Sequence, residues 1–578
     1  MLRISNPDEG YLIDPFDYLG PRRREMLEND WPAVFRQYLY EELPVDEMKP
    51  KFHATMGRPS KEFHTVLGCL LLQQVLDLTD TEVERQLAFN TEWHYALKIF
   101  TEDDESKCIC ERSLREYRSL VTELGIDEIL FQVLTDKLLK VFKVATGKQR
   151  LDSTHIHSNM RRLSRLGVFV KTIQKFIQVM ERDHPIVLRR YVDAELLGRY
   201  LDKEKGCFSQ VKPSEAKKTL QEVAEDLLVL VETFRDHPAI RRMEEYGWLA
   251  RVLEEQCQVQ GEAEESRVLV KDPKEIPSTS LQNPSDPDAT YDGHKGQGYQ
   301  VQLMETYQEA EGEERDKTQP NLITHVNVQQ AHESDGPAAL GAIEDTKDRG
   351  CAPEELLADT AYGSDDNVQK AAQEGTDLIA PAPGKSPSKE GCWRLEDFII
   401  DEESDEVIAC PVGESPDEVK RSANGTVRSY FNEDRCQACA HRHVCCVGQD
   451  EEKHELKYTT KRARLAQRRA AEKSEVFREK CRWRAGIEAT NSHLKRDLNM
   501  KRLRVRGMAN VRHVVTLKVL GWNIRQAAQA MKARILASFH YLSAGMAWIS
   551  KAIDMRLRGV RVPDVLSAPI SLLNPMPR

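Results

Sequence analysis

Two aspartates stand where short apolar runs end, a placement typical of residues that bind metal ions. Asp152 follows the run from Gln149 to Leu151 in LDST, and Asp359 follows two leucines in LLADTAYGSDDN. Ligands of open α/β sheets bind outside the ends of the strands, where such residues gather. Two carboxylates there can share a hard cation such as Mg²⁺, which prefers oxygen ligands. An aspartate after a strand is also a common helix cap or turn former, so this pattern alone leaves both interpretations open.

A third carboxylate lies in a basic helical segment near the end of the chain. Glu488 comes four residues after Arg484 and seven before Lys495, so one face of a helix carries all three. A carboxylate between cations suits a metal ligand beside phosphate groups. An ordinary ion pair between Arg484 and Glu488 accounts for the same spacing.

Four cysteines predict a second metal site. Cys410 is followed by the run CQACAHRHVC, which holds Cys436, Cys439 and Cys445. Two thiols two residues apart, with two more nearby, match part of the ligand spacing of structural Zn²⁺. A segment so poor in apolar residues needs another source of order, which favours zinc over four reduced thiols. The alternative ligands are Cys446, His441 and His443.

The elements that must position the carboxylates follow a mainly helical start. Residues 1–148 have a helical pattern, with helices over 65–78, 79–100 and 113–145. Thr79 or Asp80 is the expected N-cap of the second helix. A helix-turn-helix around Thr79 and a plain helical bundle fit equally well.

The carboxylates themselves fall in a segment that alternates strands and helices, which predicts a mixed α/β sheet. The strand before Asp152 is expected to end at Leu151, which leaves His155 and His157 in a polar turn rather than as metal ligands. The other expected elements are paired strands over 298–307 and 322–332, a helix after residue 332, a strand, turn and helix over 354–375, and a strand over 377–383.

Three further segments show no candidate catalytic residues. Residues 161–275 are mainly helical and read as an insertion, although 262–293 predicts a loop. Residues 384–450 form the cysteine-rich insert. From residue 455 the pattern is basic and helical, and 536–578 predicts a helical tail that ends in coil.

Composition excludes several classes of protein. The chain has 578 residues, 40% of them hydrophobic, which suits several globular domains. Its net charge of −11 excludes a uniformly basic nucleic-acid coat.

Residues 455–535 nevertheless hold 22 Lys and Arg against 6 Asp and Glu, a net charge of +16. Such a segment suits an anionic polymer, because cations that neutralise phosphates release counterions. The alternative is a solvated basic helix face.

We expect a cytoplasmic protein with reduced thiols and no membrane partner. No stretch reaches the ~18–20 apolar residues that a membrane span needs. The opening MLRISNPDEG lacks the pattern of a signal peptide. The 13 cysteines are sparse for a chain of this length, unlike those of disulfide-rich secreted domains.

Together these motifs resemble the DDE transposases of bacterial insertion sequences, and more narrowly the insertion-sequence eleven-eighty-two group. The matching motifs are LDST, ADTAYGS and RAGIEATNSHLKR followed by LRVRG. Residues 57–87 resemble the opening of that group's InsH-like amino-terminal domain. Residues 285–303 and 323–335 resemble the segments around the inner strands of the family's sheet.

The resemblance implies an α+β, mixed α/β fold with an RNase H-like catalytic core. The catalytic triad carries over to Asp152, Asp359 and Glu488, which would hold two Mg²⁺ (or Mn²⁺) ions. The implied domains are the helical N-terminal domain (1–148), the core (149–160, 276–383 and 451–535), the helical insertion (161–275), the insert with a structural Zn²⁺ (384–450) and the tail (536–578).

The resemblance also implies DNA as the partner, both the terminal inverted repeats and the target, bound by a nucleoid-associated homo-oligomer. The implied activity is Mg²⁺-dependent cleavage and transfer of DNA strands. Cys481 stands where the family has a tyrosine, which leaves an inactive or domesticated DNA-binding derivative as the alternative. The expected DNA contacts are Arg484, Lys495, Arg496, Arg502, Arg504 and Arg506.

Overall fold

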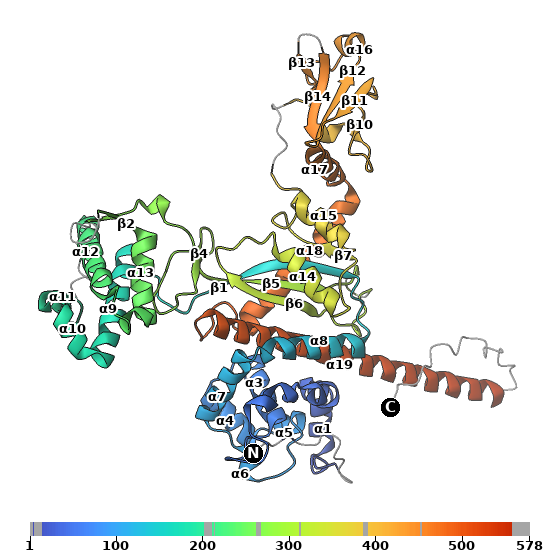
Figure 1. Ribbon diagram of the computed structural model, residues 1–578. Helices are drawn as coiled ribbons and strands as arrows, with labels where there is room; N and C mark the ends of the chain where they lie inside the picture. The colour runs from blue at the N-terminus through green and yellow to red at the C-terminus, as the bar shows by residue number, and fades with distance from the viewer. Residues whose placement is uncertain are drawn as a thin grey trace.

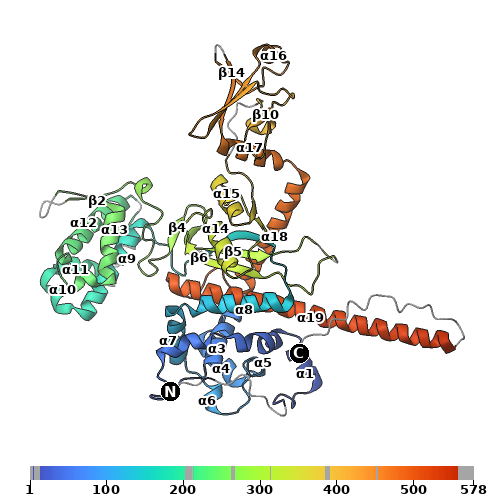
Figure 2. The ribbon, with the colours of Figure 1, turned by 45° about the vertical axis from the view of Figure 1, so that its right-hand side comes forward.

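The protein is built around a mixed sheet that has helices on both faces. The helices between residues 165 and 256 and the small sheets between residues 399 and 459 project from it in different directions (Figures 1 and 2). This mixed arrangement of helices and sheets is the fold class that the sequence predicts. The computed structural model describes residues 4, 14–201, 211–212, 214–261, 267–310, 312, 314–384, 391–450 and 453–557.

The central sheet has six strands, in the order β4-β5-β1-β7-β8 with β6 also pairing with β5. β5 is antiparallel to β1, β4 and β6, whereas β7 runs parallel to β1 and to β8. The strands are β1 (Lys148–His157), β4 (Thr290–Asp292), β5 (Gly296–Thr306), β6 (Ile323–Gln330), β7 (Glu355–Leu357) and β8 (Asp377–Ile379).

Strand β1 is longer than the sequence predicts. It continues past Leu151 to His157 and pairs with β5 over that whole length. The prediction of a polar turn after Leu151 is therefore wrong, and Asp152, His155 and His157 lie on the strand. The polar residues misled the pattern because they face packed neighbours: the His155 side chain is buried despite its polarity.

One face of the sheet is covered by the N-terminal helices and by α19 (Met508–Leu557). Apolar residues of β5 and β6 share a single core with these helices, and Figure 1 shows α8 and α19 side by side along the sheet. The N-terminal helices are α1 (Pro21–Glu28), α2 (Trp31–Val34), α3 (Phe63–Val75), α4 (Asp80–Phe89), α5 (Thr91–Ala96), α6 (Asp104–Lys107), α7 (Glu111–Glu123) and α8 (Ile126–Phe142).

Thr79 is the N-cap of α4, as predicted, and forms a capping box with Glu82. The expected single helix over 79–100 is interrupted at Asn90. The backbone of Asn90 is extended, and its side chain accepts a hydrogen bond from the backbone N–H of Glu92 to cap α5. A local side-chain cap thus ends a helical pattern that would otherwise continue.

The other face of the sheet packs against α14 (Ala338–Asp348) and α15 (Asp365–Gln373). Leu151, Met304, Leu356 and Leu378 contribute one side chain from each of four strands to this second core. The predicted paired strands, helix and strand–turn–helix are confirmed as β5, β6, α14, β7, α15 and β8.

The helical insertion has a hydrophobic core of its own. The predicted loop over 262–293 is wrong in two places, because β3 pairs with β2 in a hairpin and β4 joins the central sheet. The elements are α9 (Arg165–Asp183), α10 (Pro185–Tyr191), α11 (Ala194–Leu201), α12 (Ala216–Phe234), α13 (Glu244–Gln256), β2 (Cys257–Gln260) and β3 (Arg267–Val270).

The cysteine-rich segment forms small sheets. Strand β14 pairs with β12 and β13, so the helical pattern expected from residue 455 begins only at residue 460. The elements are β9 (Ile399–Ile400), β10 (Val407–Ala409), β11 (Glu418–Arg421), β12 (Thr426–Phe431), α16 (Glu433–Gln437), β13 (Gly448–Asp450) and β14 (Lys453–Thr459).

Three helices follow this sheet: α17 (Thr460–Ala471), α18 (Glu475–Asp497) and α19. The predicted tail does not start a new element, because α19 continues through residue 536, and residues 558–578 lie outside the described part. No helix in the described ranges has an apolar stretch of the length that a membrane span requires.

Candidate active site and basic cavity

The parallel pairing of β1 with β7 brings Asp152 and Asp359 beside each other. Arg150 lies opposite Leu357 in the last pair of this ladder. Asp152 lies two residues after Arg150, and Asp359 lies two residues after Leu357. The two aspartates therefore continue the same row of paired residues beyond the end of β7. Asp359 Oδ1 accepts a hydrogen bond from the Ala361 backbone N–H at 2.8 Å, which holds this carboxylate in the turn towards α15.

Helix α18 carries Glu488 and is fixed to the sheet by a buried ion pair. Arg150 of β1 and Glu305 of β5 lie 2.7 Å apart, with side chains 9% and 1% exposed. Arg150 Nη1 also donates to the backbone oxygen of Trp483 at 2.6 Å, and Thr490 Oγ1 donates to Glu305 Oε2 at 2.8 Å. Because buried charges persist only with well-placed partners, these contacts set how α18 lies on the sheet.

A glycine allows the close approach of α18 to β1. A Cβ atom at Gly486 would lie 1.9 Å from Nη1 of Arg150. The guanidinium of Arg150 occupies the space that a larger residue would need, two residues before Glu488 on the same helix. Gly486 is therefore part of what positions Glu488.

Asn491 connects α18 directly to the first predicted catalytic residue. Its Nδ2 donates to Asp152 Oδ2 at 3.0 Å. Its Oδ1 is buried and has no hydrogen-bond partner among the described residues. The sequence analysis missed Asn491, although its position three residues after Glu488 places both on one helix face.

The charges of the three predicted carboxylates interact. Burial raises the pKa of Asp152 to about 6, and the negative charges of Asp359 and Glu488 contribute to the increase. The positive charge of Arg484 opposes it. Residues separated by hundreds of positions in the chain thus lie within electrostatic range of one another.

The three carboxylates do not form a finished metal centre. Within the described ranges, no group of three or more His, Cys, Asp or Glu side chains is close enough to hold one ion. Glu488 is 63% exposed and pairs with Arg484, with Nη2 to Oε1 at 3.3 Å. The three side chains therefore converge on one region without yet sharing a common centre.

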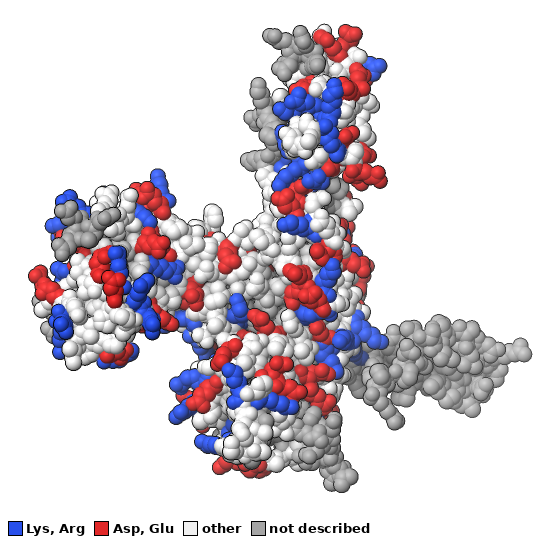
Figure 3. Space-filling model, viewed as in Figure 1, with Lys and Arg blue, Asp and Glu red and all other residues white. Residues whose placement is uncertain are grey.

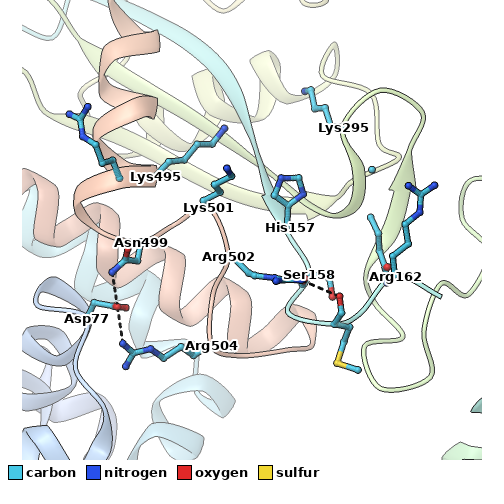
Figure 4. A pocket seen from close by; sticks show the side chains of 14 residues that line it. Asp77, His157, Ser158, Arg162, Lys295, Lys495, Asn499, Lys501, Arg502 and Arg504 are labelled. Carbon is cyan, nitrogen blue, oxygen red and sulfur yellow. Dashed lines mark hydrogen bonds and ion pairs between the residues drawn. The ribbon is translucent and has the colours of Figure 1, made fainter.

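The structure also has a basic cavity of about 850 Å³ (Figure 4), and the charge of Asp152 acts on one of its lining residues, Lys495. Among the described residues that line it, seven are Lys or Arg and one, Asp77, is a carboxylate. Four of the predicted DNA contacts line the cavity: Lys495, Arg496, Arg502 and Arg504. The other two, Arg484 and Arg506, do not. Arg484 lies at the carboxylates, and Arg506 is exposed just before α19.

The other basic run of this region, in α17, has a different role. Arg464 pairs with Asp365 at 2.7 Å and with Asp405 at 2.8 Å. Arg468 donates to the backbone oxygens of Gly363 and Ala380. The positive charge of α17 thus holds it against other parts of the chain. On the face shown in Figure 3, acidic and basic side chains are mixed rather than separated.

The four predicted zinc ligands lie near one another. Cys410 is buried, and Cys436 and Cys445 pack against the same small core. Burial raises the pKa of Cys436, and the thiols of Cys445, Cys410 and Cys439 raise it further. These thiols interact electrostatically, as the carboxylates do. In the described part of the chain, however, no three of them lie close enough together to hold one metal ion.

Two protein families match parts of the chain. Residues 409–528 match the family described as Transposase DDE domain, and residues 25–110 match the family described as Transposase domain (DUF772). No curated protein and no solved structure gives a significant match. The first match includes Glu488, α18 and five of the seven described basic residues of the cavity, but not Arg162 or Lys295. The second match covers most of the N-terminal helices. These two matches confirm the predicted resemblance of the chain to the DDE transposases of insertion sequences.

Proposed function

We propose that the protein binds the ends of its insertion sequence and catalyses Mg²⁺-dependent cleavage and transfer of DNA strands. The observation that carries this proposal is the approach of Asp152, Asp359 and Glu488 from three distant parts of the chain. A cavity rich in Lys and Arg includes Lys495, which interacts electrostatically with Asp152, and such a cavity suits a polyanionic substrate.

The topology supports an RNase H-like core. Strands β6, β5, β1, β7 and β8 form a mixed sheet. Strand β5 is antiparallel to its neighbours β6 and β1, whereas β7 and β8 run parallel to β1. We keep the predicted domain division, but assign residues 453–459 to the cysteine-rich insert because β14 pairs there. The narrower likeness to the insertion-sequence eleven-eighty-two group stays a prediction.

The donor set suits Mg²⁺ or Mn²⁺. Carboxylate oxygens are the preferred ligands of these ions. A cation would relieve the repulsion among Asp152, Asp359 and Glu488, and Asn491 Oδ1 is a spare buried acceptor beside them. When bound, the ions supply Lewis-acid activation of the phosphate and of the attacking water or 3′-hydroxyl.

The chain's own residues prepare this chemistry. Asn491 orients the Asp152 carboxylate, and Arg150 with Glu305 holds α18 on the sheet. Arg484 balances the charge of Glu488 in the absence of substrate. Phosphate groups of DNA are the expected partners of Arg484 and of the cavity's cations.

We also propose that Cys410, Cys436, Cys439 and Cys445 bind one structural Zn²⁺. Their thiols already interact with one another, and the core they pack against is small. We further propose that the protein acts on DNA as a homo-oligomer, in the cytoplasm and associated with the nucleoid.

The test replaces each carboxylate by its neutral analogue. Asp152→Asn, Asp359→Asn and Glu488→Gln should each abolish Mg²⁺-dependent cleavage of DNA that carries the element's terminal repeats, while repeat binding is retained. Asp348→Asn, an exposed carboxylate at the end of α14, is the matched control and should cleave like wild type. A carboxylate variant that cleaves as fast as wild type removes that residue from the catalytic set.

The same assay separates the two functional alternatives. An inactive derivative predicts that the wild-type protein binds its repeats but never cleaves them with Mg²⁺ or Mn²⁺. Restoring a tyrosine with Cys481→Tyr would then show whether this departure from the family accounts for the missing activity.

A further inference from the structure

The basic cavity is assembled from segments that lie far apart in the sequence. The end of β1 contributes His157 and Ser158, and the turn between β4 and β5 contributes Lys295. The end of α18 and the segment before α19 contribute Lys495 and Lys501. Figure 4 shows these side chains around one space, with Lys495 at the end of α18 and Lys501 on the connection that follows it.

Several cations of the cavity already have partners within the protein. Arg504 pairs with Asp77 at 3.1 Å, and Arg496 pairs with Asp497 at 3.0 Å. Arg502 donates to the backbone oxygens of Ser158 and Met160, each at 3.3 Å. These arginines line the wall of the cavity. Part of their charge, or some of their N–H donors, is already paired with other groups of the protein.

Three lysines differ from them. The ammonium groups of Lys295, Lys495 and Lys501 make no ion pair or hydrogen bond with any residue that the structure describes. They are also close enough to repel one another. Burial lowers the pKa of Lys495, and the charges of Lys295 and Lys501 lower it further, whereas Asp152 raises it. Unpaired, mutually repelling ammonium groups at a cavity wall favour an anion between them.

The cavity is also connected to the predicted catalytic residues. The charge of Asp152 acts on Lys495, and His155, on the same strand as Asp152, is affected by both Lys295 and Lys495. His155 is buried and held neutral: burial lowers its pKa to about 4, and His157 and the two lysines lower it further. An anion bound between Lys295 and Lys495 would therefore lie within electrostatic range of Asp152.

We propose that Lys295, Lys495 and Lys501 form a phosphodiester-binding site that guides one DNA strand to Asp152. The inference rests on the proposed function and assigns two residues, Lys295 and Lys501, that lie outside the predicted DNA contacts. A lysine binds phosphate as a point charge, so the site recognises the backbone and is indifferent to base sequence.

The test measures DNA affinity as a function of salt. Lys295→Gln and Lys501→Gln should each weaken binding of a short duplex about three- to tenfold at low salt, equally for a repeat sequence and for an arbitrary one. Each should lower the slope of log Kd against log salt concentration by about 0.9, and the double variant by about twice that amount. Lys370→Gln is the matched control: this exposed lysine of α15 lies outside the cavity, and its removal should leave the slope unchanged.

The outcomes distinguish this proposal from the proposed function. Wild-type salt slopes in both lysine variants overturn the cavity site, even if the carboxylate variants lose cleavage as expected. Reduced slopes in the lysine variants, together with a wild-type protein that never cleaves DNA, support the site and count against the proposed chemistry. If the variants lose binding of inorganic pyrophosphate but keep the wild-type DNA slope, a free anion is the ligand and the proposal is wrong.

Discussion

Asn491 donates a hydrogen bond to Asp152 across 339 residues of sequence, from Nδ2 to Oδ2 at 3.0 Å. This contact joins the helix that carries Glu488 to the strand at the centre of the sheet. The pKa of Asp152 is raised to about 6, chiefly by burial and further by the charges of Asp359 and Glu488. The geometry that gathers the acids thus costs the metal-free protein stability at neutral pH.

The first prediction concerns stability without metal. Because the folded state raises the pKa of Asp152 above its ordinary value of 3.8, the folded protein binds more protons than the unfolded chain between about pH 4 and 6. Stability is therefore lost as pH rises through this window. In EDTA, Asp152→Asn should stabilise the protein by about 1 kcal/mol more at pH ~8 than at pH ~5. Urea unfolding at the two pH values measures the difference.

Magnesium supplies the control for that prediction. Added Mg²⁺ should stabilise the wild type at pH ~8 and leave Asp152→Asn unchanged, since only the wild type retains the full set of carboxylates. An equal gain for both proteins would place the ion elsewhere.

The second prediction concerns the hydrogen bond itself. Asn491→Ala removes a donor to the charged form of Asp152, so the pKa of Asp152 should rise further. The pH at which cleavage is half-maximal should then move upward, while repeat binding stays the same. A pH profile identical to that of wild type would show that Asn491 does not act through Asp152.

The third prediction concerns the approach of α18 to the sheet. Gly486→Ala places a Cβ atom against Arg150 and forces its guanidinium away from Glu305, so we expect a loss of about 2 kcal/mol and slower cleavage. Gly341→Ala is the control, because nothing lies within 4 Å of the added atom on α14. This exposed helical site should gain about 0.5–1 kcal/mol. Equal effects at both glycines would refute the packing argument.

The fourth prediction concerns zinc. Purified protein should contain about one equivalent of zinc, and Cys436→Ser should lose it. Cys108→Ser is the matched control, since this exposed cysteine is far from the cluster in sequence and should leave the zinc content unchanged. Less than about half an equivalent in the wild type would count against a site with four ligands.

Periodicity predicted the elements well where one side of an element was apolar. Strand β6 and helices α7 and α8 follow from their patterns, because burial of one face selects that pattern. It failed in β1, where polar residues after Leu151 face packed neighbours, and in β3 and β14, whose partners are strands of the same small units. Pairing of this kind is not encoded in the local sequence of one strand.

In the candidate site, too, the sequence predicted some features and not others. Asp152, Asp359 and Glu488 could be named from motifs that resemble a family, but the contacts that position them could not. Arg150 and Glu305 pair across two strands 155 residues apart, a relation that only the sheet register creates. Lys295 was missed for a similar reason, because its turn reaches the cavity only through the pairing of β4 with β5.

The last prediction concerns the junction of the N-terminal helices with the rest of the chain. Asp77 Oδ1 accepts from Lys518 Nζ at 2.7 Å, and its Oδ2 accepts from Asn499 and Arg504. Lys518 is 1% exposed, so Asp77→Asn should leave a buried ammonium uncompensated and destabilise the protein by about 3 kcal/mol. Asparagine tolerates the positive φ of 53° at this position, so the backbone is preserved. Adding Lys518→Met should restore most of the loss in urea unfolding; a double variant no more stable than Asp77→Asn would show that the ion pair does not hold this junction.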